Sequence, residues 1–350
     1  MKNCFIQNSL SLIRHSLLVI YIIVISFITA YIVLYTGGLG SIKSTEHLVR
    51  EVKKGTVLIE NKLDTANGGI GTGFIIGENL IVTNDHVIQG NGAITVVSAN
   101  DQTRYEAEVI STDAIVDIAI LKLKKWDEFK KHEGAVILPI GDSRETLEGD
   151  KVVVIGHPWG LTWTVSEGIM SSKNRRVGSN PKYVDQVDAK IFQGNSGGPV
   201  FNEYGEVICV SELMFEGKGG SYGFCIPSVL LKKVLGDFQL FGEVRWRAMN
   251  VSIGLTEDGN SVIVNSLDAN GAADKAGIKV NDKILAIYTP NNHPAGLVVK
   301  DVNSLVSEMA TMSGADEKIK VLIERNGEKQ MIDVITNYKL SKEYEPDKAK

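Results

Sequence analysis

Short β-type runs separated by turns recur through the middle of the chain, and they constrain its fold more than any other feature. Between residues 51 and 123 these runs lie at 55–59, 73–76, 80–83, 93–97, 105–110 and 118–123. Their spacing favours a small antiparallel barrel over βαβ units. A second series includes 151–155, 165–170, 198–201 and the strands around Cys209 and Cys225, and residues 228–238 then show the polar cap and apolar spacing of a helix. The sequence therefore predicts two barrels and a closing helix.

The composition argues against several classes of function. A net charge of −5 gives no reason to expect nucleic acid as a partner. The three cysteines form neither a CxxC pair nor a His/Cys cluster, so no structural zinc site is expected, nor any other metal or cofactor. A disulfide between Cys209 and Cys225 is one interpretation, but two buried free thiols that act as small hydrophobic residues are favoured. Neither cysteine has the polar neighbours that activate a catalytic thiol.

An uncharged apolar segment at residues 16–35 has the length of a helix that crosses a bilayer. Lys2 and Arg14 precede it, so the positive-inside bias places residues 1–15 in the cytoplasm. A cleaved signal peptide is the alternative, but its apolar region is normally shorter and ends in a small-x-small site. We therefore expect an uncleaved transmembrane anchor, a linker at 36–47, and the later residues outside the cytoplasm.

Residues 194–199 read Gly-Asn-Ser-Gly-Gly-Pro and place a serine between residues that permit unusual backbone dihedrals. A nucleophile beside an oxyanion hole needs such a backbone, because amide N–H groups and one hydroxyl must point at the same spot. The alternative is a surface turn, which is the commonest role of such dipeptides. This segment alone does not decide between the two interpretations.

The order of three further features supports the catalytic interpretation. His86 follows a predicted strand, Asp117 directly precedes the apolar run at 118–123, and Ser196 comes last. His, Asp and Ser in this order on two predicted barrels match the chain order of chymotrypsin-type proteases. Asp85 and Asp113 are rival acids. Asp117 stands immediately before the apolar strand, and the family resemblance given below favours it over the other two.

Seven segments, in register and in order, resemble the trypsin-like domain of the HtrA/Deg serine proteases over residues 48–236. They are GTGFII at 71–76, TNDHV at 83–87, DIAIL at 117–121, VIGHPWG at 154–160, EGI at 167–169, GNSGGP at 194–199 and FCIPS at 224–228. The resemblance implies a mainly β, chymotrypsin-like double-barrel protease domain at 48–240. An anchor followed by one protease domain and one peptide-binding domain resembles the membrane-anchored, DegS-like branch of the family.

The resemblance also implies the role of each site residue. Ser196 attacks the scissile carbonyl, and His86 removes its proton and later protonates the leaving amine. Asp117 orients His86. The loop of Gly194, Asn195 and Ser196 forms the oxyanion hole, through the N–H groups of its first and third residues. A homotrimer and cleavage after small aliphatic residues are further expectations at the level of the family.

Residues 171–186 form a long polar segment before the nucleophile loop. One interpretation is a solvated surface loop. By resemblance, the segment occupies the place of the sensor loop that relays peptide binding to the oxyanion hole, with Arg175 or Arg176 as the residue that carries the signal. The loop after Asn61 is short, unlike the long inserted arm of some family members.

A second unit is predicted at 245–338, where strands at 261–265, 283–287, 319–323 and 329–335 accompany helices at 271–277 and 302–312. Residues 272–284 are similar to an α+β PDZ domain of the HtrA kind. Val302, Leu305, Val306 and Met309 share one helical face and are either core residues or, in part, the wall of a groove. Val302 and Val306 are the groove candidates, because a C-terminal peptide adds as a strand beside this helix in PDZ domains.

The carboxylate-binding loop of this PDZ domain is expected at Ala248, Met249, Asn250 and Val251. Family members usually have glycine where Asn250 stands and a larger residue in place of Ala248. Asn tolerates left-handed dihedrals better than most residues, so the loop geometry is expected to survive while ligand preference stays open. Residues 339–350 form a charged tail that is expected to be disordered.

The leading hypothesis is a serine endopeptidase anchored in the inner membrane of a bacterium, with both domains on the periplasmic side. It would cleave misfolded or signalling proteins under stress and respond to C-terminal peptides at the PDZ domain. The alternative is a non-proteolytic chaperone or peptide sensor on the same fold. The intact set of His86, Asp117 and Ser196 argues against that alternative.

Overall fold

The computed structural model describes residues 44–62, 69–90, 92–98, 102–161, 163–176, 183–217, 220–290, 293–314 and 317–340. The predicted transmembrane segment at 16–35 and the six residues after Lys62 lie outside these ranges. Within them, no helix has the length and apolar character that crossing a membrane requires.

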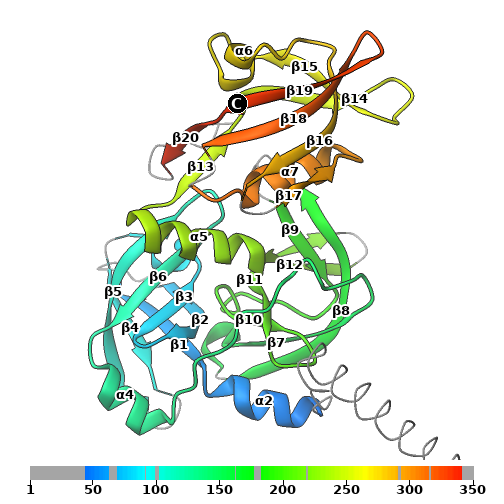
Figure 1. Cartoon of the computed structure of the whole chain (residues 1–350). Coiled ribbons are helices and arrows are strands. Elements are labelled where there is room, and N and C mark those ends of the chain that lie inside the picture. Colours follow the sequence, from blue (N-terminus) through cyan, green and yellow to red (C-terminus); the bar gives the residue numbers. More distant parts are fainter. Residues whose placement is uncertain are drawn as a thin grey trace, which may run out of the picture. The chain divides into compact units, whose positions relative to one another are not determined.

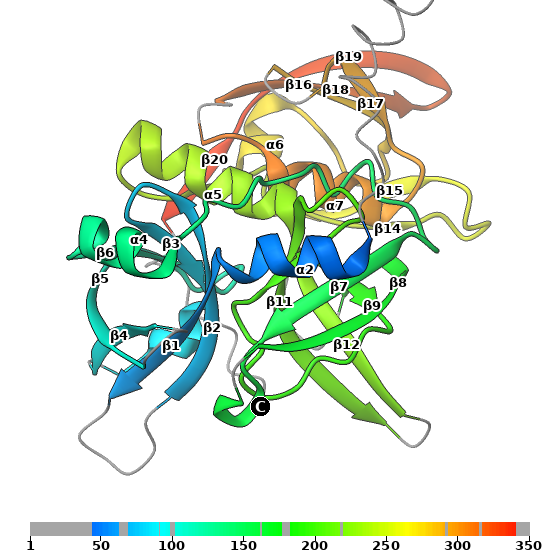
Figure 2. The same cartoon turned by 90° about the horizontal axis from the view of Figure 1, so that it is seen from below.

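Two closed six-stranded antiparallel barrels confirm the predicted double-barrel fold (Figure 1, Figure 2). The first has the order β1-β2-β3-β6-β5-β4 and is built from β1 (Thr56–Lys62), β2 (Gly69–Gly77), β3 (Leu80–Thr83), β4 (Ala93–Val97), β5 (Arg104–Asp113) and β6 (Ile118–Leu123). The second has the order β10-β11-β12-β9-β8-β7 and is built from β7 (Lys151–Gly156), β8 (Thr164–Arg176), β9 (Tyr183–Val187), β10 (Pro199–Phe201), β11 (Val207–Gly217) and β12 (Gly220–Pro227).

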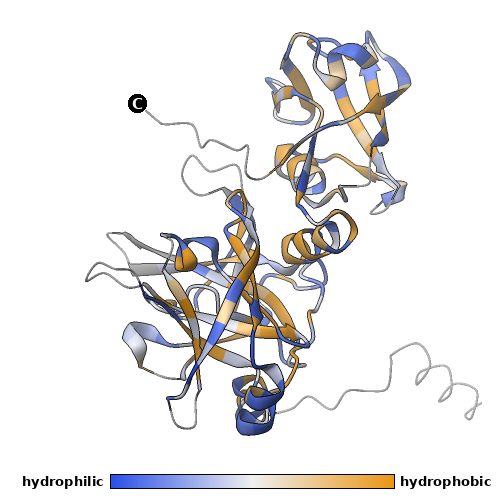
Figure 3. Ribbon diagram, turned by 90° about the vertical axis from the view of Figure 1, so that its left-hand side faces the viewer, coloured by the Kyte–Doolittle hydropathy of each residue, from blue (hydrophilic) through white to orange (hydrophobic). Residues whose placement is uncertain are grey.

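Strands such as β2 and β7 read as nearly continuous apolar runs because both of their faces are largely buried. In β2, Ile75 points into the first barrel, whereas its neighbour Phe74 joins a core between the two barrels. In β7, Val154 likewise faces the second barrel and Ile155 the shared core. This alternation follows from the two-residue period of a strand. Figure 3 shows the apolar residues gathered along the barrel strands.

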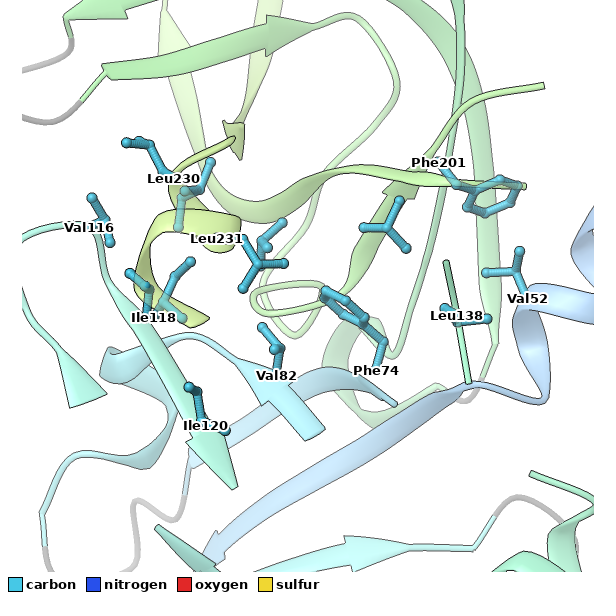
Figure 4. Close-up of a cluster of buried hydrophobic side chains, with 14 of the residues drawn as sticks. Val52, Phe74, Val82, Val116, Ile118, Ile120, Leu138, Phe201, Leu230 and Leu231 are labelled. Atoms are coloured by element: carbon cyan, nitrogen blue, oxygen red, sulfur yellow. The ribbon is translucent and has the colours of Figure 1, made fainter. Parts of the chain in front are cut away.

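The predicted closing helix is α5 (Ser228–Phe241), and it seals the shared core. Leu230 and Leu231 are buried beside Ile118 and Phe74, which come from the first barrel (Figure 4). Gly242 ends the helix with a left-handed φ of 72°, and its N–H donates to the Phe238 carbonyl. This core fixes the barrels against each other, and the candidate site lies on loops of both barrels.

Two helices were not predicted from the sequence. Helix α2 (Thr45–Lys53) buries Leu48 and Val52 in the shared core. Helix α4 (Trp126–Glu133) places Phe129 edge-on against Tyr105, with ring centroids 5.1 Å apart. Both helices are short and mostly polar, so few apolar positions indicate their period.

The expectation that residues 171–186 form one long loop is wrong. Strand β8 continues to Arg176 and β9 begins at Tyr183, so that Arg175 pairs with Val184. Polar side chains on exposed strand faces gave this segment the composition of a loop. Residues 177–182 lie outside the described part of the chain.

The C-terminal region confirms the predicted α+β unit. Its sheet has the order β14-β15-β16-β18-β19, with β17 paired to β16, and it is accompanied by two helices and a two-stranded ribbon. The elements are β13 (Arg245–Ala248), β14 (Val251–Leu255), β15 (Val262–Leu267), α6 (Ala272–Ala276), β16 (Lys283–Thr289), β17 (His293–Val298), α7 (Val302–Thr311), β18 (Lys318–Arg325), β19 (Glu328–Ile335) and β20 (Asn337–Leu340). Lys339 and Leu340, assigned to the tail from the sequence, pair with β13 instead. The predicted disorder of 341–350 falls outside the described residues.

Candidate active site

His86 and Asp117 are brought together by two paired strands of the first barrel. His86 lies on α3 (Asp85–Ile88), directly after β3, and Asp117 stands directly before β6. The His86 Nδ1 lies 2.7 Å from Asp117 Oδ2, and the His86 backbone N–H donates to Oδ1 at 2.9 Å. Because a carboxylate only accepts hydrogen bonds, this contact fixes the Nδ1–H tautomer of a neutral ring, in which Nε2 is the nitrogen that can take up a proton.

Asp117 is held in an unusual backbone conformation. Its φ is +60°, a region that Asp and Asn enter more readily than most residues. The Asn84 side-chain amide donates to the Asp117 carbonyl at 2.7 Å and stabilises this turn. The carboxylate is therefore aimed at His86 by the local backbone as well as by the strand pairing.

The two rival acids have other partners. Asp113 accepts from the Val116 N–H at 2.9 Å and from the Trp246 indole N–H at 2.7 Å. Asp85 accepts from the Gln89 side-chain amide at 3.1 Å. Of the three acids, Asp117 is the one in contact with the His86 ring.

Ser196 is presented by a loop of the second barrel that packs against the first. The Thr72 N–H in β2 donates to the Ser196 carbonyl at 2.8 Å. A Cβ on Gly71 would meet the same carbonyl at 3.2 Å and the side chain of Val87, the residue after His86, at 2.5 Å. The Ser196 hydroxyl donates to the Glu212 carbonyl at 2.9 Å. The nucleophile candidate and the His86–Asp117 pair therefore meet at the junction of the two barrels.

The loop also directs two backbone N–H groups. The Gln193 carbonyl accepts from the Trp159 N–H at 3.0 Å, and the Asn195 carbonyl accepts from the Gly198 N–H at 2.9 Å. Because a trans peptide is planar, the N–H groups of Gly194 and Ser196 point away from those carbonyls. Gly194 has a φ of +102°, which glycine adopts readily.

Asn195 differs from its two neighbours in this loop. Its N–H donates to the Phe192 carbonyl at 2.9 Å, so that amide is committed to the loop's own turn. The N–H groups of Gly194 and Ser196 are not committed in this way by the bonds described above, and their role as oxyanion donors stays a prediction.

No individual role was predicted for Thr72, His157 or Trp159, although all three lie against this loop. His157 is fully buried, and burial together with the charge of Lys53 lowers the pKa of its ring to about 3. The glycines on either side of Thr72 were the available signal, because they mark a strand that another backbone approaches closely.

Strands β8 and β9, at the predicted sensor segment, contain a buried carboxyl group. Asp185 accepts from the Asn174 N–H at 2.9 Å, and burial raises its pKa to about 6 against the opposing effects of that bond, Lys173 and the Cys209 thiol. Arg175 is exposed on β8. The geometry assigns no role in signalling to Arg175 or Arg176, so that role stays a prediction.

Cys209 and Cys225 are free and buried, as the favoured interpretation expected. Burial raises the pKa of both thiols. Neither is suited to nucleophilic attack, since the thiolate is the reactive form. Among the described residues, no group of three or more His, Cys, Asp or Glu side chains is arranged to hold a metal ion.

The PDZ candidates lie around the edge strand β14. Asn250 has a φ of +62°, which agrees with the expected tolerance of asparagine for this conformation. Its side-chain carbonyl accepts from Asn337 at 2.9 Å, and its backbone carbonyl from the Asp268 N–H at 3.1 Å. Ala248 ends β13 and Val251 begins β14, so the loop itself is Met249 and Asn250.

The predicted groove helix is α7, and its apolar face is divided. Leu305 is buried in the core of this domain, whereas Val302 and Val306 are half-buried. The outer edge of β14 is not paired within the described sheet. This combination leaves room for the expected strand addition, which remains a prediction.

The fold and the site together define a two-barrel, trypsin-like protein with an attached PDZ domain. Residues 71–210 match the trypsin-like peptidase domain family, and residues 250–336 match the PDZ domain family. The solved serine endoprotease from Yersinia pestis is similar with a TM-score of 0.60 and 30% identity, over 85% of this chain and 98% of that one. The chain therefore belongs to the HtrA/Deg family of serine proteases.

Two further comparisons define how far the similarity reaches. A probable periplasmic serine endoprotease, DegP-like, of Brucella suis biovar 1 (strain 1330) is 35% identical over 280 residues, which are 75% of this chain and 52% of that protein. The chain thus spans about half the length of the curated relatives that it matches. The HtrA-type protease AlgW, solved with a tripeptide, shares the fold at a TM-score of 0.68 and 24% identity, over 85% of this chain and 98% of that one.

Proposed function

We propose that this protein is a serine endopeptidase that uses Ser196 as nucleophile, His86 as general base and Asp117 as the group that orients His86. The observation that carries the proposal is the double contact between Asp117 and His86, at 2.7 Å to the ring and 2.9 Å to the backbone N–H. The function of a chaperone or peptide sensor on this fold would not require a histidine held in one tautomer near the loop that carries Ser196.

The mechanism follows from these contacts. The Ser196 hydroxyl turns from the Glu212 carbonyl toward His86, which takes its proton as Oγ attacks the scissile carbonyl. Asp117 stabilises the imidazolium that forms. The N–H groups of Gly194 and Ser196 bind the developing oxyanion, and the loss of one such donor typically costs about 3–4 kcal/mol of transition-state stabilisation. His86 then protonates the leaving amine, and water hydrolyses the acyl-enzyme by the same route.

The proposed setting is the bacterial inner membrane, with both domains on the periplasmic side. The apolar segment at 16–35 supports an anchor, and the relatives named periplasmic support the compartment. We further propose the DegS-like arrangement, a homotrimer, and a role in cleaving misfolded or regulatory proteins under stress. These three points follow from family resemblance.

We also propose that C-terminal peptides bind the PDZ domain and stimulate cleavage. The unpaired edge of β14 and the half-buried Val302 and Val306 support a groove for an added strand. The HtrA-type protease AlgW, which shares the fold, was solved with a decapeptide, and this supports the proposal.

Labelling with a fluorophosphonate probe tests both parts of the proposal. The full chain should be labelled, and the labelling should disappear in Ser196→Ala. A peptide that ends in an apolar residue with a free carboxylate should accelerate labelling, whereas the same peptide with an amidated C-terminus should not.

The outcomes separate enzyme activity from regulation. Absence of labelling with every peptide, or equal labelling of Ser196→Ala, would favour the non-proteolytic alternative. Equal labelling rates with the free and amidated peptides would exclude stimulation through a carboxylate loop while leaving the protease intact.

A further inference from the structure

Thr72 of the first barrel bonds the nucleophile loop through both its backbone and its side chain. It is fully buried in β2, and its N–H donates to the Ser196 carbonyl at 2.8 Å. Its hydroxyl donates to the Gly194 carbonyl at 2.7 Å. One side chain and one backbone group of Thr72 therefore hold carbonyls on both sides of Asn195.

The hydrogen-bonding capacity of this hydroxyl is fully used. A threonine hydroxyl has one proton and two lone pairs. The Gly194 carbonyl can only accept, so the hydroxyl donates its hydrogen to that carbonyl. The backbone N–H of His157 donates to one lone pair of the hydroxyl at 3.1 Å. The His157 Nδ1, also at 3.1 Å, must then donate to the other lone pair.

The donors and acceptors around the Thr72 hydroxyl therefore place the proton of a neutral His157 ring on Nδ1. The ring is fully buried, and among the described residues its Nε2 has no hydrogen-bond partner. In a neutral imidazole one ring nitrogen carries the proton, so Nε2 is unprotonated when Nδ1 donates. Lys53 adds a positive charge that disfavours imidazolium. His157 is therefore fixed as a donor to Thr72.

We propose that Thr72, supported by His157, is a positioning residue that keeps the N–H groups of Gly194 and Ser196 aimed at the oxyanion. The inference rests on the proposed function and concerns how its oxyanion hole is held. Thr72 fixes the Gly194 and Ser196 carbonyls, while Trp159 and Gly198 fix the Gln193 and Asn195 carbonyls. Four consecutive carbonyls are thus anchored, and each planar peptide between them can point its N–H in one direction only.

The close packing around Thr72 leaves no space for a substitute donor. A Cβ on Gly197 would clash with the Thr72 carbonyl, and a Cβ on Gly198 would meet the Thr72 methyl group at 3.0 Å. A Cβ on Gly194 would meet the His157 carbonyl at 2.5 Å. Without the hydroxyl, the Gly194 carbonyl would lose its donor. If the peptide between Gly194 and Asn195 turned toward another donor, the two neighbouring peptides, which carry the N–H groups of Gly194 and Ser196, would turn with it.

The test compares Thr72→Val with Thr72→Ser in the full chain. Valine has nearly the shape of threonine but no hydroxyl, and serine keeps the hydroxyl. We expect Thr72→Val to lower kcat about 10- to 100-fold with KM changed less than threefold, because displaced N–H groups stabilise the oxyanion of the transition state less. Thr72→Ser, which keeps the hydroxyl, should have a kcat within about fivefold of the parent.

A matched control separates positioning from stability. Thr56 is also buried in the first barrel, and its hydroxyl donates to the Val52 carbonyl at 2.9 Å. Thr56→Val should lower the unfolding temperature about as much as Thr72→Val but leave kcat unchanged. A peptide aldehyde forms a tetrahedral oxyanion adduct. Its affinity should fall in Thr72→Val by about the same factor as kcat, whereas the affinity of the corresponding peptide amide should stay unchanged.

The role of His157 is tested by a double-mutant cycle with Thr72. His157→Phe should lower kcat when Thr72 is present and add no further loss when combined with Thr72→Val. Additive losses would overturn the assignment of His157 as the support for Thr72.

Two results would overturn the inference as a whole. One is an unchanged kcat in Thr72→Val, and the other is an equal loss in Thr72→Val and Thr72→Ser. Both are read against a parent whose turnover disappears in Ser196→Ala. If the parent has no Ser196-dependent turnover, the proposed function fails instead.

Discussion

Ser196→Ala is expected to lower kcat for a fluorogenic peptide by about 10⁶-fold, the scale seen when the nucleophile of a serine protease is removed. The alanine removes the hydroxyl that lies 2.9 Å from the Glu212 carbonyl and leaves the backbone of the loop intact. The variant should therefore fold and bind substrate with little change in affinity. Steady-state kinetics and a binding titration with the same peptide give the two quantities.

Ser166→Ala serves as the control for this substitution. The Ser166 hydroxyl also donates to a backbone carbonyl, that of Lys190, at 2.7 Å. Its removal should leave kcat within about twofold, as surface substitutions usually do. Comparable losses in the two variants would contradict the assignment of Ser196 as nucleophile.

The second large effect is expected for Asp117→Asn, which should lower kcat by about 10⁴-fold at neutral pH. The amide has nearly the shape of the carboxylate, but its NH₂ group would face His86 Nδ1 across the 2.7 Å contact. The ring would then adopt the other tautomer, with its proton on Nε2, and could no longer take the proton of Ser196. The unfolding temperature should change little, so the loss appears in kinetics.

Asp113→Asn distinguishes this role from a general effect of removing an acid. Asp113 bonds Val116 and Trp246, and its substitution should affect stability but leave kcat nearly unchanged. A loss in Asp113→Asn as large as in Asp117→Asn would contradict the choice of Asp117.

The double barrel and the pairing of Asp117 with His86 were predictable because each left a local signal. Short apolar runs such as 118–123 need only neighbouring residues to be recognised. Asp117 was favoured for its place before this run, and the pairing of β3 with β6 gives the physical reason, since it brings that position beside His86. The left-handed conformation of Asn250 was likewise expected from its residue type.

The supports of the nucleophile loop could not be predicted in the same way. Thr72 and Gly194 are far apart in the sequence, and nothing in the residues around Thr72 identifies its hydroxyl as the donor to that carbonyl. His157 was part of a recognised segment, but its tautomer follows from three distances that exist only in the fold. Long-range contacts of this kind have no local pattern.

The end of β8 at Arg176 and the start of β9 at Tyr183 show a second limit on predicting structure from sequence. The sequence between residues 171 and 186 has the polarity of a loop, yet strand pairing extends into it from both sides. Backbone hydrogen bonds to a neighbouring strand stabilise such residues whatever their polarity, so tertiary context overrides the local preference.

The most direct test of the account is to trap the covalent intermediate during turnover. The full chain is mixed with an activated acyl ester, quenched with acid within its first turnovers, digested and mapped by mass spectrometry. The account predicts one acyl group per chain, attached to Ser196 and absent from Ser196→Ala. An acyl group on another residue, or turnover without any acyl-enzyme on Ser196, would contradict it.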